Sequence, residues 1–265
     1  MITTMKHIVR KSLSAASVAT LAATSAAAAQ DRPATPPQPV RPVVVEMFLS
    51  QACRLSPAAA EALNEFAGQS DVITLAWHVD YYNAVAAEDV GAWVDPFART
   101  AYSERQRVYN EQIRGRRTVF TPQAIINGAT SVSGMRREAI ERGITESVAT
   151  AHAPAPSLRI SRLVDGQGAT KRKRFRAAIE NMSGAYDAIL VTFAPRAITV
   201  VSGGDNAGMT FRETNVVTSV TRMAVNGAGP VDADFNAPPK GYSCAVLVQE
   251  KNRGRIMAAQ YCPQN

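Results

Sequence analysis

The sequence lacks the motifs that identify most functions directly. It has no glycine-rich phosphate-binding loop, no dinucleotide-binding fingerprint and no basic-aromatic pattern suited to nucleic acid. It has only three histidines and three cysteines, and their spacing fits no metal-binding pattern. These absences argue against nucleotide, nucleic-acid and metal chemistry. We therefore predict no cofactor, no bound metal and no nucleic-acid partner.

Long apolar runs are also absent after residue 29, so no later segment is predicted to cross a membrane. The first 29 residues, 1–29, resemble an export signal: Lys6, Arg10 and Lys11 precede a small-residue apolar stretch and an Ala-x-Ala site ending at Ala29. We expect cleavage after Ala29 and a periplasmic or secreted protein without stable membrane insertion. Residues 30–41 then read as a proline-rich leader.

The three cysteines are an odd number, so one must remain unpaired. "CAVLVQE" and "RIMAAQYC" are two strand-like runs separated by the polar turn "KNRG", which predicts a hairpin. Folding about that turn brings Cys244 and Cys262 nearly opposite each other, and an oxidising compartment permits the bond. We predict a Cys244–Cys262 disulfide and a free Cys53.

The first part of the chain, 42–152, alternates strand and helix signals. The apolar run at 42–50 predicts a buried strand, Ser56-Pro57 begins a helix that Gly68 ends, and 71–82 predicts a second strand parallel to the first. Amphipathic helical segments follow up to residue 114. "VFTPQAIING" and "TSVSG" then predict a hairpin, and "MRREAIERGITESVATAH" a closing helix. This order is typical of an α/β thioredoxin-like domain with a helical insertion.

The second part of the chain, 157–265, is predicted to be a separate, mainly antiparallel β domain. "APAPS" at 153–157 reads as the linker between the two domains. The strand-like runs after it are short and closely spaced: "SLRISRLV", "RFRAAIEN", "DAILVTFAP", "AITVVSG", "FRETNVVTSVTRM" and the final hairpin.

Cys53 lies between a predicted strand and a predicted helix. The amide groups at a helix N-terminus and the adjacent Arg54 both favour a thiolate there. A thiolate attacks disulfides and accepts mixed disulfides. Ser56 occupies the place where a dithiol site carries its second cysteine, and a hydroxyl cannot resolve a mixed disulfide. Ser56 is equally consistent with a helix N-cap, and Cys53 with an inert buried side chain.

Other residues are candidates for the surroundings of Cys53. We predict that the Thr121–Pro122 bond is cis and lies beside Cys53, because this fold class recurrently presents substrate backbone there. His78 and Asp80 lie at the end of the second strand, where His78 is either a tuning group for Cys53 or a hydrogen-bonded rim residue. A Cys53–His78–Asp80 hydrolase triad is a distant alternative. Glu46 is either a proton relay beneath the thiol or a paired glutamate.

The remaining charge signal is mildly basic. Removal of the signal leaves a net charge of 26 − 22 = +4. Two basic runs, "RGRR" at 114–117 and "KRKRFR" at 171–176, are candidates for binding an anionic substrate such as glutathione or an acidic peptide, or are simply solvated faces.

Four segments together resemble a bacterial family of exported, thioredoxin-like proteins, the domain of unknown function numbered twelve-twenty-three. They are "VVEMFLSQAC…SP", "LAWHVDYY", "DPFA…AYSERQRVY" and "VFTPQAIING"; "GGDNAGMTFRETNVV" and "CAVLVQ…GRIMAA" match its C-terminal half. The resemblance covers nearly all of the chain after the signal. It implies the fold and the export route, and the family has no settled activity.

Matched to the family motifs, Cys53 corresponds to the first cysteine, Pro57 to the proline after the motif and Thr121–Pro122 to the cis-proline pair. The recurrent polar positions are those of His78, Asp80 and Gln123. Three positions depart from the family pattern: Ser56 replaces the second cysteine, Leu55 a serine and Ala60 an acid. These departures call dithiol oxidoreductase activity into question for this chain.

The sequence therefore predicts single-cysteine (CxxS) thiol–disulfide chemistry at Cys53, with Ser56, His78, Thr121 and Pro122 around it. The expected partner is a protein or a low-molecular-weight thiol or disulfide, such as a glutathione-like molecule. The alternative is a non-catalytic periplasmic binding or accessory protein on a thioredoxin-like scaffold.

Overall fold

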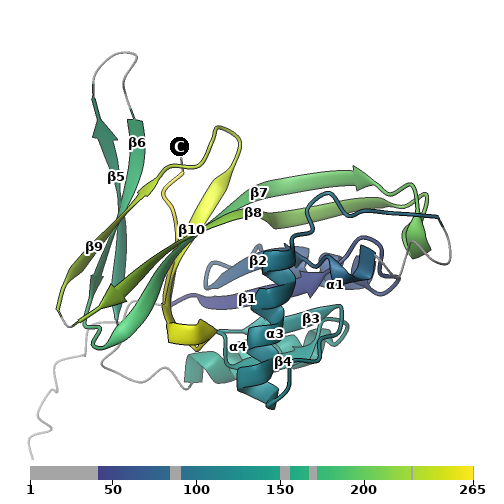
Figure 1. Ribbon diagram of the computed structural model, residues 1–265, viewed down its shortest axis with the longest axis horizontal. Helices are drawn as coiled ribbons and strands as arrows, with labels where there is room; N and C mark the ends of the chain where they lie inside the picture. The colour runs from purple at the N-terminus through teal and green to yellow at the C-terminus, as the bar shows by residue number, and fades with distance from the viewer. Residues whose placement is uncertain (1–40, 84–90, 150–155, 167–171, 228, 265) are drawn as a thin grey trace, which may run out of the picture. The chain divides into compact units, whose positions relative to one another are not determined.

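The computed structural model describes residues 41–83, 91–149, 156–166, 172–227 and 229–264 (Figure 1). The predicted signal at 1–29, residues 30–40 of the leader and residues 153–155 of the linker lie outside them. The helices are α1 (Ser56–Phe66), α3 (Thr100–Arg114), α4 (Arg137–Ala149) and the short η2 (Gly204–Asn206) and η3 (Lys251–Arg253). The strands are β1 (Val43–Leu49), β2 (Val72–His78), β3 (Gln123–Ile126), β4 (Thr130–Ser133), β5 (Ser157–Asp165), β6 (Arg172–Glu180), β7 (Ala185–Val200), β8 (Thr210–Asn226), β9 (Val231–Asn236), β10 (Ser243–Glu250) and β11 (Ile256–Tyr261).

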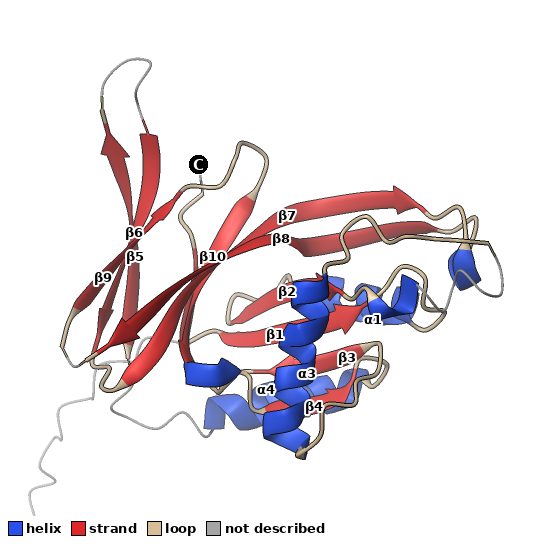
Figure 2. Cartoon of the chain, in the orientation of Figure 1, coloured by secondary structure: helices blue, strands red, loops and turns tan. Residues whose placement is uncertain are grey.

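The strands form two sheets, so the protein has a mixed α/β fold (Figure 2). The main sheet has eight strands in the order β11-β10-β7-β8-β2-β1-β3-β4, and the second sheet has three in the order β5-β6-β9. β1 and β2 are parallel, whereas β3–β4 and β10–β11 are antiparallel hairpins. The predicted strand-helix-strand unit and both predicted hairpins are therefore present.

The central strands are covered on both faces, as the unbroken apolar run at 42–50 predicts. Val44 and Phe48 of β1 pack with Tyr109 of α3, whereas Met47 packs on the opposite face with Leu63 of α1. In Figure 1, α3 crosses in front of β1 and β3. Each fully buried side chain of this kind contributes roughly 2 kcal/mol of hydrophobic stabilisation. The apolar run therefore anchors the centre of the sheet.

The two predicted domains are not separate units. Four strands of the main sheet come from each of them, and 39–265 forms one compact unit. The join is a single bridge between Ala76 of β2 and Val216 of β8. The predicted division between 152 and 157 thus does not describe the fold, because the C-terminal strands complete the sheet that the N-terminal strands begin.

β7 and β8 form a long hairpin that the sequence interpretation divided into shorter runs. They pair from Ala185–Asn226 to Val200–Thr210, with an irregularity between Thr192 and Phe193. Only the first half of β7 also pairs with β10. In Figure 1 the far end of this hairpin, with η2 at its tip, lies on the same side as α1.

The three-stranded sheet packs against the C-terminal half of the main sheet. Phe175, Ile179 and Phe235 share a buried cluster with Tyr186 and Val246 of the main sheet. The sequence interpretation missed β9, whose residues "VDADFN" alternate polar and apolar over only six positions.

The predicted disulfide between Cys244 and Cys262 is present, with a Cα–Cα distance of 5.3 Å. The Cys262 amide also donates to the Cys244 carbonyl at 2.8 Å, so the end of the chain is held against β10 twice. A loop of this size gives a stabilisation of about 3 kcal/mol. Within the described ranges, no helix combines the length and apolar character needed to span a bilayer.

Candidate functional site

Cys53 lies in the turn that joins β1 to α1. The turn is closed by hydrogen bonds from the Cys53 amide to the Ser50 carbonyl at 3.0 Å and from the Ser56 amide to the Cys53 carbonyl at 2.9 Å. Pro57 lies in the first turn of α1, where its missing amide hydrogen costs nothing. Cys53 is the free cysteine, as predicted, but only 2% of its surface is exposed. The exposed thiol that the sequence predicted is therefore covered in this structure.

The Thr121–Pro122 peptide bond is cis, and it lies beside Cys53, as predicted. The Cys53 Sγ lies 3.7 Å from the Thr121 carbonyl oxygen, close enough for the thiol to donate to it. Gly134 lies against the proline, because its amide donates to the Pro122 carbonyl and a Cβ there would approach the Pro122 Cβ to 2.9 Å and the Met47 Sδ to 2.6 Å. The turn is therefore held tightly next to the sulfur.

Ser56 has a different role from either of those predicted. Its buried hydroxyl accepts a hydrogen bond from the Ser50 amide at 3.2 Å. The N-cap of α1 is Leu55, and no side chain caps the helix. Ser56 thus closes the Cys53 turn from inside, and the N-cap interpretation is wrong.

His78 is fully buried between two carboxylates. Its Nδ1 lies 2.7 Å from Asp95 Oδ2, and its Nε2 lies 3.3 Å from Glu213 Oε1. Burial opposes the charged form, but the Glu213 and Asp95 carboxylates outweigh it and raise the pKa of His78 to about 10. The same ion pair holds the pKa of Asp95 below its usual range against the opposing effect of burial. His78 is therefore an imidazolium whose two nitrogens face carboxylates.

The Cys53–His78–Asp80 triad is not formed. Asp80 instead accepts hydrogen bonds from the hydroxyls of Ser103 and Thr100, at 2.5 and 2.6 Å. The neighbour of His78 is Asp95, which no sequence motif paired with it. The hydrolase alternative therefore loses the triad on which it rested, because His78 and Asp80 are each paired with other residues.

The network around His78 ends on the Cys53 turn. Asp95 accepts the Gln51 amide at 2.8 Å, and Glu213 accepts the Gln51 side-chain amide at 2.8 Å. Asn206 at the tip of the β7–β8 hairpin donates to the carbonyls of Gln51 and Cys53 at 2.8 and 2.9 Å. We call Gln51, His78, Asp95, Asn206 and Glu213 the turn-holding network.

Sequence reasoning did not find Asn206 or Glu213 as site residues. Both lie in "GGDNAGMTFRETNVV", which was noticed only as a family-like stretch. They reach the Cys53 turn because the long β7–β8 hairpin returns to it from more than 150 residues away along the chain. The polar character of that stretch was the available signal.

Two tyrosines lie near Cys53. Burial and the charge of a Cys53 thiolate raise the pKa of Tyr82 to about 12, and the pKa of Tyr81 is raised for the same two reasons. The Tyr81 hydroxyl donates to Gln106 at 3.1 Å, and Gln106 donates to Gln123 at 2.7 Å. Gln123 is thus a buried polar support for the strand that follows Pro122.

Glu46 is a paired glutamate. Arg105 of α3 donates to its two oxygens at 2.7 and 3.1 Å, and Tyr109 also donates to it. Side chains of a strand alternate between faces, so Glu46 faces α3 with Val44 and Phe48, on the face opposite α1. The proton-relay interpretation is therefore wrong.

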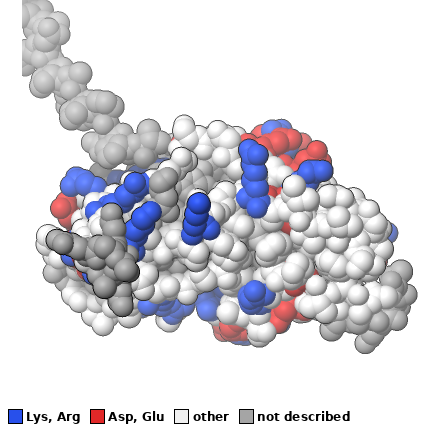
Figure 3. Space-filling view, turned by 90° about the horizontal axis from the view of Figure 1, so that it is seen from above, with Lys and Arg blue, Asp and Glu red and all other residues white. Residues whose placement is uncertain are grey.

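The two basic runs do not form one binding patch. Arg117 pairs with Glu104 and Glu111, while Arg174 and Arg176 pair with Asp165, Asp232 and Asp234. Figure 3 shows Lys and Arg side chains in separate groups on one face, some beside acidic groups. Arg117, Arg174 and Arg176 are therefore neutralised locally.

The part of the chain that the structure describes contains no group of three His, Cys, Asp or Glu side chains arranged to hold a metal ion. His152, the last of the three histidines in the sequence, lies outside the described residues.

Fold and site together define a class: mixed α/β proteins with one free cysteine between a parallel strand and a helix, beside a cis Thr–Pro bond. The chain belongs to the family described as "Protein of unknown function (DUF1223)", whose model matches residues 44–249. It is similar to a crystal structure of a protein from Agrobacterium tumefaciens, a structural genomics target, with 26% identity and a TM-score of 0.65 over 86% of this chain and 96% of that one. No curated protein matches the chain.

Proposed function

We propose that this protein carries out single-cysteine thiol–disulfide exchange at Cys53 on a thioredoxin-like domain in the periplasm or outside the cell. The observation that carries the proposal is the 3.7 Å contact between the Cys53 Sγ and the carbonyl of the cis Thr121–Pro122 bond. Thr121 and Pro122 would present the backbone of an extended substrate to the sulfur. The residues at 1–29 and the Cys244–Cys262 disulfide support export to an oxidising compartment.

The exchange step needs no cofactor. The Cys53 thiolate attacks one sulfur of a disulfide R–S–S–R′, a new Cys53–S–S–R bond forms, and R′S⁻ leaves and takes up the proton that Cys53 lost. The Ser56 hydroxyl cannot resolve this mixed disulfide. A second thiol R″SH from outside the protein attacks its R sulfur, so that R–S–S–R″ leaves and Cys53 recovers its thiol with the proton of R″SH.

Exchange requires that the Cys53 sulfur become accessible to the disulfide. With 2% of Cys53 exposed, a disulfide reaches it only when the surroundings of the turn move. This requirement favours a partner that binds first, such as a protein thiol or a peptide-like thiol, over unassisted collision.

The same burial favours a second candidate function. A covered cysteine is also what a binding or accessory protein retains on a scaffold without turnover, with the C-terminal strands engaging a partner. The two candidates differ in whether native Cys53 exchanges at all.

The test is the rate of Cys53 alkylation across pH in the folded protein without its signal, with Cys53→Ser as the blank. The proposal predicts that Cys53 is alkylated in the native protein, without denaturant. Alkylation seen only in denaturant supports the accessory protein.

Turnover is tested separately with insulin reduction by wild type and Ser56→Cys. With dithiothreitol as the electron donor in every reaction, we expect little acceleration of insulin reduction by wild type, and a gain of turnover in Ser56→Cys, whose second thiol can resolve the mixed disulfide. Absence of turnover in both would favour the accessory function.

A further inference from the structure

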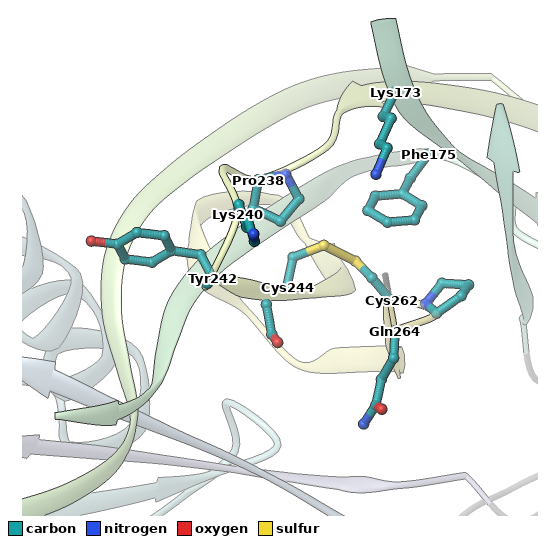
Figure 4. A pocket seen from close by; sticks show the side chains of 11 residues that line it. Lys173, Phe175, Pro238, Lys240, Tyr242, Cys244, Cys262 and Gln264 are labelled. Carbon is teal, nitrogen blue, oxygen red and sulfur yellow. A yellow bond between two sulfur atoms is a disulfide. The ribbon is translucent and has the colours of Figure 1, made fainter. Parts of the chain in front are cut away.

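A pocket of about 380 Å³ lies beside the Cys244–Cys262 disulfide, where the two sheets meet (Figure 4). Its lining comes from three separate segments: β6, the connection between β9 and β10 together with the start of β10, and the residues after β11. A volume of this size is typical of small-molecule sites. The pocket shares no lining residue with the Cys53 site.

The pocket has an apolar floor. Phe175 and Cys244 are 2% and 1% exposed, and Pro238 and Pro263 form further apolar parts of the wall. The disulfide holds the C-terminal residues in place as one side of the pocket. These surfaces suit an apolar or aromatic group.

Two lysines give the pocket its charge. Lys173 and Lys240 both line it, and no acidic residue does. Within the described ranges, neither lysine makes an ion pair. In Figure 4 the end of the Lys173 side chain extends toward the Phe175 ring. The pocket thus combines two unneutralised cations with an apolar floor.

The two faces of β6 differ in whether their basic side chains form ion pairs. Side chains alternate along β6, so Lys173, although exposed, lies on the same face as the buried Phe175, whereas Arg174 and Arg176 lie on the outward face. The two outward arginines are neutralised by Asp165, Asp232 and Asp234, as described above. Among the described side chains, carboxylates therefore pair with Arg174 and Arg176 on one face of β6, and none pairs with Lys173 on the other.

We infer that this pocket binds a small organic carboxylate with an apolar or aromatic body, its carboxylate between Lys173 and Lys240 and its body against Phe175 and the disulfide. Such a carboxylate exists as a free small molecule or as the C-terminal end of a peptide. This inference does not depend on Cys53 chemistry.

The experiment is calorimetric titration of the folded protein with 3-phenylpropionate, its amide as the neutral control, and acetyl-dipeptides ending in phenylalanine with a free or amidated C-terminus. The variants are Lys173→Met, Lys240→Met and the double variant, with Arg196→Met on β7 as a matched loss of one exposed charge outside the pocket.

We expect saturable binding of the free carboxylates and none of the amides. Each lysine substitution should weaken binding about fivefold, because an exposed ion pair contributes up to about 1 kcal/mol. Added salt should weaken the binding too, while Arg196→Met leaves it unchanged. Tighter binding of the peptide assigns the site to a chain end, and tighter binding of phenylpropionate to a free metabolite.

Absence of carboxylate binding at millimolar concentration would overturn the inference. So would binding that persists unchanged in the double variant, or equal binding of acids and amides. Far-ultraviolet circular dichroism of each variant establishes that it is folded before titration.

Discussion

Two buried polar networks lie on opposite faces of the central strands. In the first, the Glu46 network, the Arg105 guanidinium donates to both oxygens of Glu46. Arg105 and the side-chain amide of Gln249 also each donate to the Tyr109 hydroxyl at 2.7 Å. In the other, the turn-holding network, His78 lies between Asp95 and Glu213. Each has a buried cation beside carboxylates, yet they differ in how well they are satisfied.

The Glu46 network has no unsatisfied side-chain atom among the described residues that compose it. In the turn-holding network Gln51 Oε1 lacks a hydrogen bond, and His78 Nε2 and Glu213 Oε1 form an ion pair at 3.3 Å without hydrogen-bond geometry. Fully satisfied networks hold elements rigidly, and unsatisfied buried groups concentrate at functional sites. The first network joins α3 to β1 and β10, and the second ends at the Cys53 turn. We therefore expect the Glu46 network to contribute mainly to stability and the turn-holding network to belong to the candidate site.

The largest expected effect comes from breaking the satisfied network. Arg105→Met leaves the Glu46 carboxylate buried without its cation, and we expect a loss of about 3–5 kcal/mol in the free energy of unfolding. Urea unfolding measures it. The double variant Glu46→Met/Arg105→Met removes both charges and should recover most of the loss. A double variant as unstable as the single one would contradict this account.

The turn-holding network should instead respond to pH. The pKa of His78 is raised from 6.5 to about 10, so its ion pairs contribute fully below pH 6.5 and are lost as the pH rises toward 10. Wild-type stability should fall over that window, and His78→Gln should lack this part of the fall. The Glu46→Met/Arg105→Met protein, measured in parallel, should show the same fall in stability between pH 6.5 and 10 as wild type. Equal slopes in wild type and His78→Gln would show that His78 is not charged.

A smaller effect separates stability from access to the sulfur. Asn206→Ala removes two hydrogen bonds to the Cys53 turn, at a cost of about 1–3 kcal/mol, and should speed native-state alkylation of Cys53 several-fold. Asn64→Ala is the matched control, because Asn64 also bonds the backbone of β8 but not the Cys53 turn. Faster alkylation in both variants would mean that general destabilisation governs access to Cys53, and not the Asn206 hydrogen bonds to its turn.

The smallest effect is expected at the surface. Arg176→Gln removes outward ion pairs to Asp232 and Asp234, and exposed pairs contribute little. Its melting temperature should match that of wild type by calorimetry. A fall as large as that of Arg105→Met would show that the outward charges of this sheet carry real stability.

Local signals predicted much of the fold. The run "VVVEMFL" marks β1 because a strand covered on both faces must be apolar throughout, and "KNRG" marks the final turn. The cis bond at Thr121–Pro122 and the disulfide also followed from local context combined with the fold. These features are decided by residues close together in sequence or by a hairpin.

What the sequence could not reveal depends on contacts between distant segments. One bridge, Ala76–Val216, merges the two predicted domains, and no local pattern encodes it. His78 was paired with Asp80 because they are near in sequence, yet Asp95 and Glu213 reach it through folding. Asn206 likewise reaches Cys53 only through the long hairpin.

The most direct test of the central claim is the intact mass of the folded protein after incubation with glutathione disulfide. We predict one glutathione adduct on Cys53 under native conditions, absent in Cys53→Ser and removed by added thiol. An adduct that forms only after unfolding would contradict the proposal that Cys53 exchanges disulfides in the native protein.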